Sequence, residues 1–548
     1  MGAALAWQGE SATERFAVTR AAFAALLRLV GGEETQRMGH SDLERLLAAE
    51  GQALLRQLYQ DCVDEQAQGQ VAAAEVVDAE GRARPQQRQQ RRELETIFGT
   101  VEVKRRGYGA PGQASLHPLD AQLNLPAERY SLEVRRRVAL EASKSSFDET
   151  VASLQRYSGA TIGKRQVEQL VVRAACDFEA FYEQRHQVAA DEQAAADAQA
   201  AGDEQAAVEP AAAAAPAADT LLVISSDGKG VVMHRQDLRP ATRAASERTP
   251  RSKMGSRLSK GEKRNRKRMA TVATVYSVAP HVRTPQQMLA LLARDEAAEA
   301  NRSRPRPQHK RVWSSLQHGP RQVLEEAFRE ALQRDPQRRR RWVAVVDGNE
   351  QQLAILEQLA AQHEVQLTIV LDIFHVLEYL WKAGHALAAE GSKELEQWVL
   401  QRLGRLLEGR APQVAAGMRR SATKRRLTKR QRQPLDRCAN YLLKYQDYLA
   451  YDEYLGAGLP LGSGVIEGAC RHLINDRLGI TGARWRLSSA EAVLRLRALR
   501  SSGDFDEYWA FHEVRHWQRT HQQRYADGQV PELRHPPREP RPHLSIVR

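Results

Sequence analysis

Hydrophobic and polar positions divide the chain into a helical first part, a polar middle segment and a mixed second part. Residues 1–94 place leucines and phenylalanines three and four positions apart, which is the spacing of an amphipathic helix. Short alternating runs in 95–130 predict a small β element, and helical spacing returns in 131–186. Residues 187–219 are almost entirely Ala, Glu, Asp and Gln, so we expect a linker there, part helical and part disordered.

Beyond the linker, strand and helix patterns follow one another in a β-β-β-α-β-α-β order, which is the order of the ribonuclease H-like fold. A strongly helical stretch then precedes a final glycine-rich segment, so we interpret it as an all-helical insertion. We therefore expect an α/β ribonuclease H-like catalytic domain made of 220–375 and 456–500, the insertion at 376–455, and a basic C-terminal tail at 501–548. The predicted strands are 221–226, 231–235, 270–278, 342–346 and 365–371, with helices at 320–333 and 350–362.

Charge and composition narrow the class of partner. The 548 residues include 81 Lys and Arg against 68 Asp and Glu, a net charge of +13 that favours a polyanion. No stretch approaches the ~20 apolar residues of a membrane span, so we expect no membrane partner. The four cysteines are far apart and form no CxxC pair, which argues against a disulfide framework or a cysteine zinc site and fits a cytoplasmic, nucleoid-associated protein.

Three acidic residues carry the candidate chemistry. Asp227 and Asp347 each end an apolar run and precede a glycine, and Glu467 lies at the start of a predicted helix within Gly462–Cys470. Hard ions such as Mg²⁺ or Mn²⁺ prefer carboxylate oxygens. Two such ions ~3.5–4 Å apart can stabilise the attacking and leaving oxygens of a phosphoryl displacement. The alternatives are Asp-Gly turns after two strands and an ordinary glutamate in a first helical turn.

The order of these motifs resembles the DDE-class bacterial insertion-sequence transposases, closest to the ISKra type and related to Mutator-like transposases. The similarity covers residues 95–515 and rests on Ser225–Gly230, Val346–Asn349, Leu371–Val376, Gly462–Gly468 and the helix after Trp485. It implies that Asp227, Asp347 and Glu467 form the catalytic, metal-binding triad, holding two Mg²⁺ or Mn²⁺ ions. Where related proteins often carry a CxxC pair, after Arg105–Tyr108, this chain has Gly109–Gln113, so a zinc-stabilised β element is not expected.

Asp372 and His375 form a DxxH pair that resembles a signature found near the active site of related transposases. Asp372 follows a predicted buried strand and is the rival of Asp347 for the second ligand position. Fold order favours Asp347, because the ribonuclease H-like fold places its second carboxylate on strand four. His375 could be a core histidine, an orienting residue or a proton carrier.

A helix-turn-helix is predicted within 131–186. Residues 147–157 form one short helix, 158–163 the turn and 164–175 the second helix. Lys164, Arg165, Gln166 and Gln169 would be exposed on the second helix, where their side chains suit base edges and phosphates. The alternative is a plain helical hairpin with solvated charges.

Three basic runs in the second part are candidates for phosphate contacts, which position DNA without reading its sequence. The first, 251–268, lies between predicted strands two and three and includes Lys263, Arg264, Arg266, Lys267 and Arg268. The others are Arg338–Arg341 and 419–432. We expect the first run to be disordered without DNA, and the alternative for all three is solvated surface.

These observations predict a transposase that cuts double-stranded DNA at transposon ends and transfers the freed 3′-OH into target DNA, as a homo-oligomer assembled on DNA. Two alternatives remain open. One is a ribonuclease H-like nuclease with the same triad and no strand transfer. The other is a DNA-binding regulator whose catalytic fold is inert.

Overall fold

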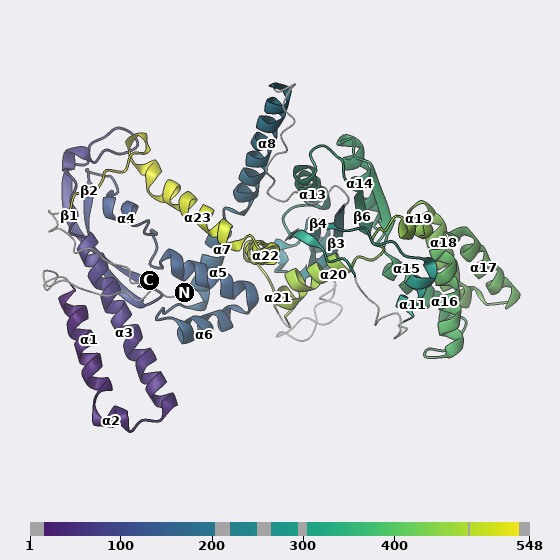
Figure 1. Ribbon diagram of the computed structural model, residues 1–548, viewed down its shortest axis with the longest axis horizontal. Coiled ribbons are helices and arrows are strands. Elements are labelled where there is room, and N and C mark those ends of the chain that lie inside the picture. Colours follow the sequence, from purple (N-terminus) through teal and green to yellow (C-terminus); the bar gives the residue numbers. More distant parts are fainter. Residues whose placement is uncertain (1–15, 203–219, 249–264, 294–303, 481–482, 536–548) are drawn as a thin grey trace. The chain divides into compact units, whose positions relative to one another are not determined.

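The computed structural model describes residues 16–202, 220–248, 265–293, 304–480 and 483–535 (Figure 1). The chain forms two compact units. The terminal unit combines Met1–Asp177 with Asp506–Arg548, and the sheet unit is Phe178–Phe505. The division does not fall within the expected linker at 187–219 but earlier, and helix α8 (Phe178–Gly202) begins the sheet unit. The remainder of the expected linker, 203–219, lies outside the described residues.

The terminal unit begins with helices and continues into a β-hairpin. Helices α1 (Ala17–Val30), α2 (Glu33–Gln36) and α3 (His40–Gln66) precede the antiparallel strands β1 (Gln86–Thr96) and β2 (Gly99–Gly109). Strand β1 lies largely in 1–94, where the sequence predicts only helix. Its sequence is mostly Gln and Arg with no apolar alternation, so its strand structure depends on pairing with β2 rather than on a local pattern.

The next helices match the predicted helix-turn-helix positions. After α4 (Pro118–Gln122) and α5 (Leu132–Lys144), helix α6 covers Phe147–Tyr157 and α7 covers Lys164–Ala174. A capping box starts α6, because the Ser146 hydroxyl accepts from the Glu149 amide and the Glu149 carboxylate accepts from the Ser146 amide. The two predicted helices and the turn between them are confirmed.

The C-terminal segment is not simply a tail. Helix α23 (Phe505–Thr520) belongs almost entirely to the terminal unit. Its Tyr508 hydroxyl donates to the carbonyl of Ala174 at 2.7 Å, and its Trp517 indole donates to the carbonyl of Ala121 at 2.8 Å. The expected basic tail at 501–548 is therefore wrong for this helix, whose aromatic side chains are held by residues more than 300 positions earlier.

A five-stranded mixed sheet forms the centre of the sheet unit. Its order is β5-β4-β3-β6-β7, with β4 antiparallel to both of its neighbours, β3 and β5, and with β6 and β7 parallel to β3. The bounds are β3 Leu221–Val232, β4 Lys267–Val278, β5 Gln308–Ser315, β6 Trp342–Val346 and β7 Leu367–Leu371.

Two predicted strands need correction. Residues 231–235 are not a separate strand, because β3 continues through Asp227 and Gly228 to Val232. The true third strand, β5, was missed because its first half, Gln-His-Lys-Arg, is polar and only the second half is buried. The basic run 251–268 therefore lies between the first and second strands of this sheet. Most of that run, 251–264, lies outside the described residues.

Helices pack on the sheet and share its core. Helix α13 (Pro320–Arg334) packs against β3, β4 and α14 (Glu350–Gln362), and α22 (Leu487–Ser502) packs against β5. Every residue of β6 is buried, as expected of a central parallel strand. Shorter helices α9 (Pro240–Arg248) and α11 (Pro285–Leu292) follow β3 and β4.

Only helices occur between β7 and the glycine-rich segment. They are α15 (Ile373–Gly384), α16 (Lys393–Leu407), α17 (Ala411–Lys424), α18 (Lys429–Lys444) and α19 (Tyr451–Gly456). Their buried residues belong to the same hydrophobic cluster as the sheet, so the insertion is part of one core. The chain then enters α20 (Gly464–Ala469), a π-helical turn (Cys470–Asn475) and α21 (Asp476–Leu478). None of the helices in the described ranges is long and apolar enough to span a bilayer.

Candidate active site

Strand register brings three aspartates into one row at the end of the parallel strands. Ser225 pairs with Val345, so two residues further Asp227 is level with Asp347. Val346 pairs with Leu371, so one residue further Asp347 is level with Asp372. The Asp372 amide donates to the Val346 carbonyl at 2.8 Å, which continues the pairing to that point. Because neighbouring strands lie about 4.8 Å apart, the backbones of these three residues lie side by side.

Asp227 lies within a strand, not at a turn. It pairs with Val272 in the β3–β4 ladder, which overturns the Asp-Gly turn as the alternative at this position. Its Oδ1 accepts from the Gly228 amide at 2.6 Å and its Oδ2 from the Cys470 thiol at 3.2 Å. Burial, followed by the charge of Asp227, raises the pKa of the Cys470 thiol, so Cys470 stays protonated and can donate.

Asp347 follows β6 directly, where the chain turns sharply. Gly348 has a φ of +87°, and a Cβ there would meet the Leu371 side chain at 2.9 Å and the Tyr441 hydroxyl at 3.3 Å. Only glycine fits this turn without strain. The Asp347 Oδ1 accepts from the Asn349 amide at 3.0 Å, and its Oδ2 has no hydrogen-bond partner among the described residues. Asp347 is partly exposed and thus has an oxygen free for a ligand.

Asp372, by contrast, is 2% exposed and has both oxygens occupied. Its Oδ1 accepts from the Phe374 amide at 2.9 Å, capping α15, and its Oδ2 accepts from the Ser463 hydroxyl. Burial raises the pKa of Asp372 against the opposing effect of these hydrogen bonds. This geometry favours Asp347 as the ligand and gives Asp372 a positioning role.

Glu467 approaches this row from α20, which packs against β3 and β4. Its pKa is raised first by burial and then by the nearby charges of Asp372 and Asp227, while Lys229 opposes the shift. Its carboxylate has no hydrogen-bond or ion-pair partner among the described residues. Glu467 thus contributes an exposed carboxylate near two other carboxylates, with Lys229 as the cation that opposes their effect on its pKa.

The donor set suits a hard divalent ion. Asp227, Asp347 and Glu467 offer oxygens only. After burial, the charges of Asp372 and Asp227 raise the pKa of Glu467, and a bound cation would relieve that repulsion. The oxygens do not form one closed cage, because no three of these carboxylates bring ligand atoms within 4.8 Å of one another among the described residues. The arrangement fits carboxylates that flank an open site better than a closed structural site.

A group whose ligand atoms do lie within 4.8 Å of one another is Cys176, Asp177 and His512 in the terminal unit. Its donors are already engaged. Arg519 donates to both Asp177 oxygens, at 2.6 and 2.9 Å, and the His512 Nδ1 lies 2.6 Å from the same carboxylate. Burial raises the pKa of the Cys176 thiol to about 11. We interpret this group as a buried ion-pair network, since a metal would have to displace the guanidinium from Asp177.

His375 lies on α15 beside tyrosines. Its ring is 5.5 Å from that of Tyr379 and 6.1 Å from that of Tyr441. The Tyr441 hydroxyl donates to the Asp347 carbonyl at 3.3 Å. The insertion therefore supports the turn after Asp347, and His375 is part of that aromatic packing near Asp372.

The predicted recognition side chains are exposed. Lys164, Arg165, Gln166 and Gln169 all lie on the solvent side of α7, whose opposite face buries Val167, Leu170 and Val171. Lys164 also forms an ion pair with Asp148 of α6 at 2.6 Å. This exposed face of α7 is available to a partner molecule. That it binds DNA stays a prediction.

Two arginines from the basic runs have structural partners. Arg268 donates to the carbonyls of Leu316 and Asp237 at 2.7 and 3.0 Å, and Arg340 donates to the Leu221 carbonyl and the Ser277 hydroxyl. Both guanidiniums hold the fold, which weakens the expectation that these positions contact phosphate. Lys267 and Arg266 are described at the start of β4, whereas Lys263 and Arg264 lie outside the described residues.

Three residues near the acidic side chains, Ser463, Cys470 and Lys229, were not predicted as site residues from the sequence. Ser463 and Cys470 reach Asp372 and Asp227 across 91 and 243 positions, so only the fold brings them there. Lys229 follows Asp227 by two residues in β3, and the strand period of two could have placed it on the same face as Asp227.

A scan against models of known protein families finds no match to this chain. A search of curated proteins likewise finds no significantly similar sequence.

Proposed function

We propose that the protein is a metal-dependent DNA transposase of the DDE class, acting on double-stranded DNA as a homo-oligomer. The observation that carries the proposal is the level row of Asp227 and Asp347, with Glu467 near enough for the charges of Asp372 and Asp227 to act on it. The sheet order β5-β4-β3-β6-β7 supports it, because a ribonuclease H-like fold is expected to carry its acidic residues on strand one, at the end of strand four and on the helix after strand five.

Each residue of the site has a distinct task in this proposal. Asp227, Asp347 and Glu467 would hold the cations, and Mg²⁺ would supply positive charge to the attacking and leaving oxygens. The Cys470 thiol fixes the orientation of Asp227. Asp372 ties the end of β7 to the segment that carries Glu467, through the Ser463 hydroxyl. Exposed residues of α7 would bind the DNA ends.

The proposal is tested with the DNA that flanks the coding sequence in its genome. Purified protein and Mg²⁺ should release a 3′-OH at the flanking ends and join it to a second DNA, and both products are visible on a denaturing gel. Cleavage without joining would favour a nuclease. Binding without cleavage, unchanged in a Glu467→Gln variant, would favour an inert regulator.

The ligand assignment has its own control within the row. Asp347→Asn should abolish cleavage, because it removes a charge from the partly exposed position. Asp372→Asn keeps one oxygen that can accept from the Phe374 amide and places an NH2 group that can donate to the Ser463 hydroxyl, so it should retain measurable cleavage. The opposite result would make Asp372 the ligand and the assignment wrong.

A further inference from the structure

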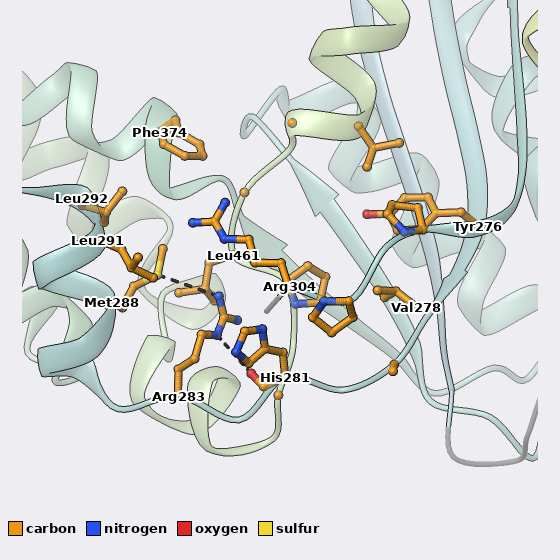
Figure 2. Close-up of a pocket in the computed structure, with 18 of the residues that line it drawn as sticks. Tyr276, Val278, His281, Arg283, Met288, Leu291, Leu292, Arg304, Phe374 and Leu461 are labelled. Atoms are coloured by element: carbon orange, nitrogen blue, oxygen red, sulfur yellow. Dashed lines mark hydrogen bonds between the residues drawn. The ribbon is translucent and has the colours of Figure 1, made fainter. Parts of the chain in front are cut away.

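A cavity of about 590 Å³ opens beside the acidic residues in the sheet unit (Figure 2). Its volume lies within the roughly 300–1,000 Å³ of small-molecule sites. The wall is largely apolar: Met288, Leu291 and Leu292 lie on one side and Tyr276 and Val278 on the other (Figure 2). Phe374 forms part of the rim and is 44% exposed, so its ring is accessible to a ligand.

The cavity and the acidic site are built from the same two segments. Phe374 lines the cavity, and its amide donates to Asp372. Gly462, Gly464 and Val465 also line it, and Ser463 between them bonds to Asp372. Val465 and Glu467 lie on the same short helix, α20, so the cavity and the acidic site also share this helix.

The charge of the cavity is opposite to that of the acidic site. Arg283 and Arg304 line it, and among the described residues that line it none is Asp or Glu. Hydrogen bonds to the carbonyls of His281 and Leu459 hold the Arg283 guanidinium in place. Burial and then the charge of Arg304 lower the pKa of Arg283, so an anion here would relieve repulsion between the two guanidiniums.

The position of the Phe374 ring depends on Gly462, which has no side chain. A Cβ on Gly462 would lie 2.6 Å from the Phe374 ring, so any larger residue would push the ring out of place. The ring thus stays at the edge of the cavity that Arg283 and Arg304 also line (Figure 2). An aromatic face, an apolar wall and two cations together match a planar base with an attached phosphate.

We propose that this cavity takes one unpaired nucleotide of the bound DNA, with the base against Phe374 and the phosphate at Arg283 and Arg304. The inference rests on the proposed function, because it takes the acidic site to act on DNA. Enzymes that act on DNA can extrude a nucleotide from the duplex at a cost that is least where the base is already unpaired. Such a contact would hold the strand in register while a neighbouring phosphate lies at the carboxylates.

The test compares three duplexes of one sequence in EDTA, where no cutting occurs: fully paired, with one unpaired adenine, and with an unpaired abasic nucleotide. The wild-type full chain should bind the unpaired adenine about tenfold more tightly than the abasic duplex, in the range that stacking on an aromatic ring contributes. Equal affinities for these two would overturn the inference.

Variants assign the effect to the cavity. Phe374→Ala should remove the preference for adenine and leave affinity for the paired duplex unchanged. Ile480→Ala is the control: it changes a similarly exposed apolar residue outside the cavity and should keep the preference for adenine. Leu291→Trp, which fills the cavity, should act as Phe374→Ala does. Arg304→Glu should weaken binding of the adenine and abasic duplexes alike. An adenine preference that survives in Phe374→Ala and Leu291→Trp would overturn the inference.

The two proposals fail in different ways. If wild-type protein keeps the adenine preference but never cuts DNA with Mg²⁺, the cavity assignment stands and the transposase proposal fails. If it cuts DNA but shows no adenine preference, the transposase proposal stands and the cavity assignment fails. No measurable binding to any of the three duplexes would overturn both.

Discussion

The two units surround their carboxylates in opposite ways: Asp177 of the terminal unit is buried, whereas Glu467 of the sheet unit is exposed. In the terminal unit, Asp177 is surrounded by Arg519 and His512, and both of its oxygens are engaged. In the sheet unit, Glu467 faces Asp372 and Asp227, and no described cation pairs with it. A paired carboxylate stabilises the folded chain, whereas gathered carboxylates cost stability. The second arrangement is the one that the proposed cation site requires.

The largest expected effect is on catalysis. Asp227→Asn, Asp347→Asn and Glu467→Gln should each lower DNA cleavage by about a thousandfold or more, because a metal ligand contributes several kcal/mol to the transition state. End binding in a gel shift should stay nearly intact. Glu453→Gln is the matched control, since Glu453 is an exposed first-turn glutamate of the short helix α19. Normal cleavage by Glu467→Gln would remove the distinction between the two units.

A second test addresses the paired charges. Asp177→Asn should destabilise the chain by about 3–5 kcal/mol, because it leaves a guanidinium without its buried partner. Asp506→Asn removes a carboxylate that is 84% exposed and pairs with Arg136, and it should cost less than about 1 kcal/mol. Denaturant unfolding of the full chain measures both. Equal small losses would mean that the Asp177 network is no more stabilising than a surface pair.

The pH dependence of stability should have opposite signs in the two units. Burial lowers the pKa of His117 and His516 to about 3 and that of His521 to about 4, below the unfolded value of ~6.5. The unfolded chain then binds more protons between those values, so the terminal unit loses stability as pH falls through this window. The raised pKa of Glu467 has the opposite effect on stability. The folded chain binds the extra proton, so this contribution to stability increases as pH falls.

Melting curves of variants between pH 7 and pH 4 separate these contributions. His516→Gln should flatten the loss of melting temperature on acidification, since one buried titrating group is gone. Glu467→Gln should raise the melting temperature slightly at pH 7 and have no effect at low pH, where Glu467 is protonated. A Glu467→Gln variant that is less stable than wild type at pH 7 would contradict the proposed repulsion.

The smallest effect concerns phosphate binding by the first basic run. Changing Lys263, Arg264, Arg266 and Lys267 to Ala should weaken binding equally for end and random DNA. The log–log salt slope should fall by ~0.9 for each phosphate that these side chains neutralise in the wild type. Lys164→Ala with Arg165→Ala should instead weaken end binding more than random binding. Arg268→Ala serves as a fold control, because that side chain holds two carbonyls. An unchanged salt slope would make the run solvated surface.

Local pattern predicted much of the sheet unit and less of the terminal unit. Strands β6 and β7 and helices α6 and α7 were predicted within a few residues, because burial imposes a clear apolar spacing on them. Strand β1 and helix α23 were missed, since their structure depends on partners elsewhere in the chain. The glycine after Asp227 suggested a turn, but pairing with β4 carries the strand through it.

The candidate site shows the same limit. Asp227, Asp347 and Glu467 could be selected from their sequence setting, but their alignment with Asp372 follows only from the register of three strands. The rivalry between Asp347 and Asp372 needed burial and hydrogen bonds to assess. Ser463, whose hydroxyl occupies one Asp372 oxygen, could not have been found without the fold.

The bond between Ser463 and Asp372 also has a consequence for how the chain can change in evolution. Together with the hydrogen bond from the Ile373 amide to the Leu461 carbonyl, it ties the two ends of the helical insertion to each other. The insertion is thus a closed loop, and doubling the length of a flexible closed loop costs only about 0.6 kcal/mol. Residues could be added to the turns between its helices while Glu467 keeps its place, whereas deleting one residue from β6 would turn the later side chains of that strand to the other face.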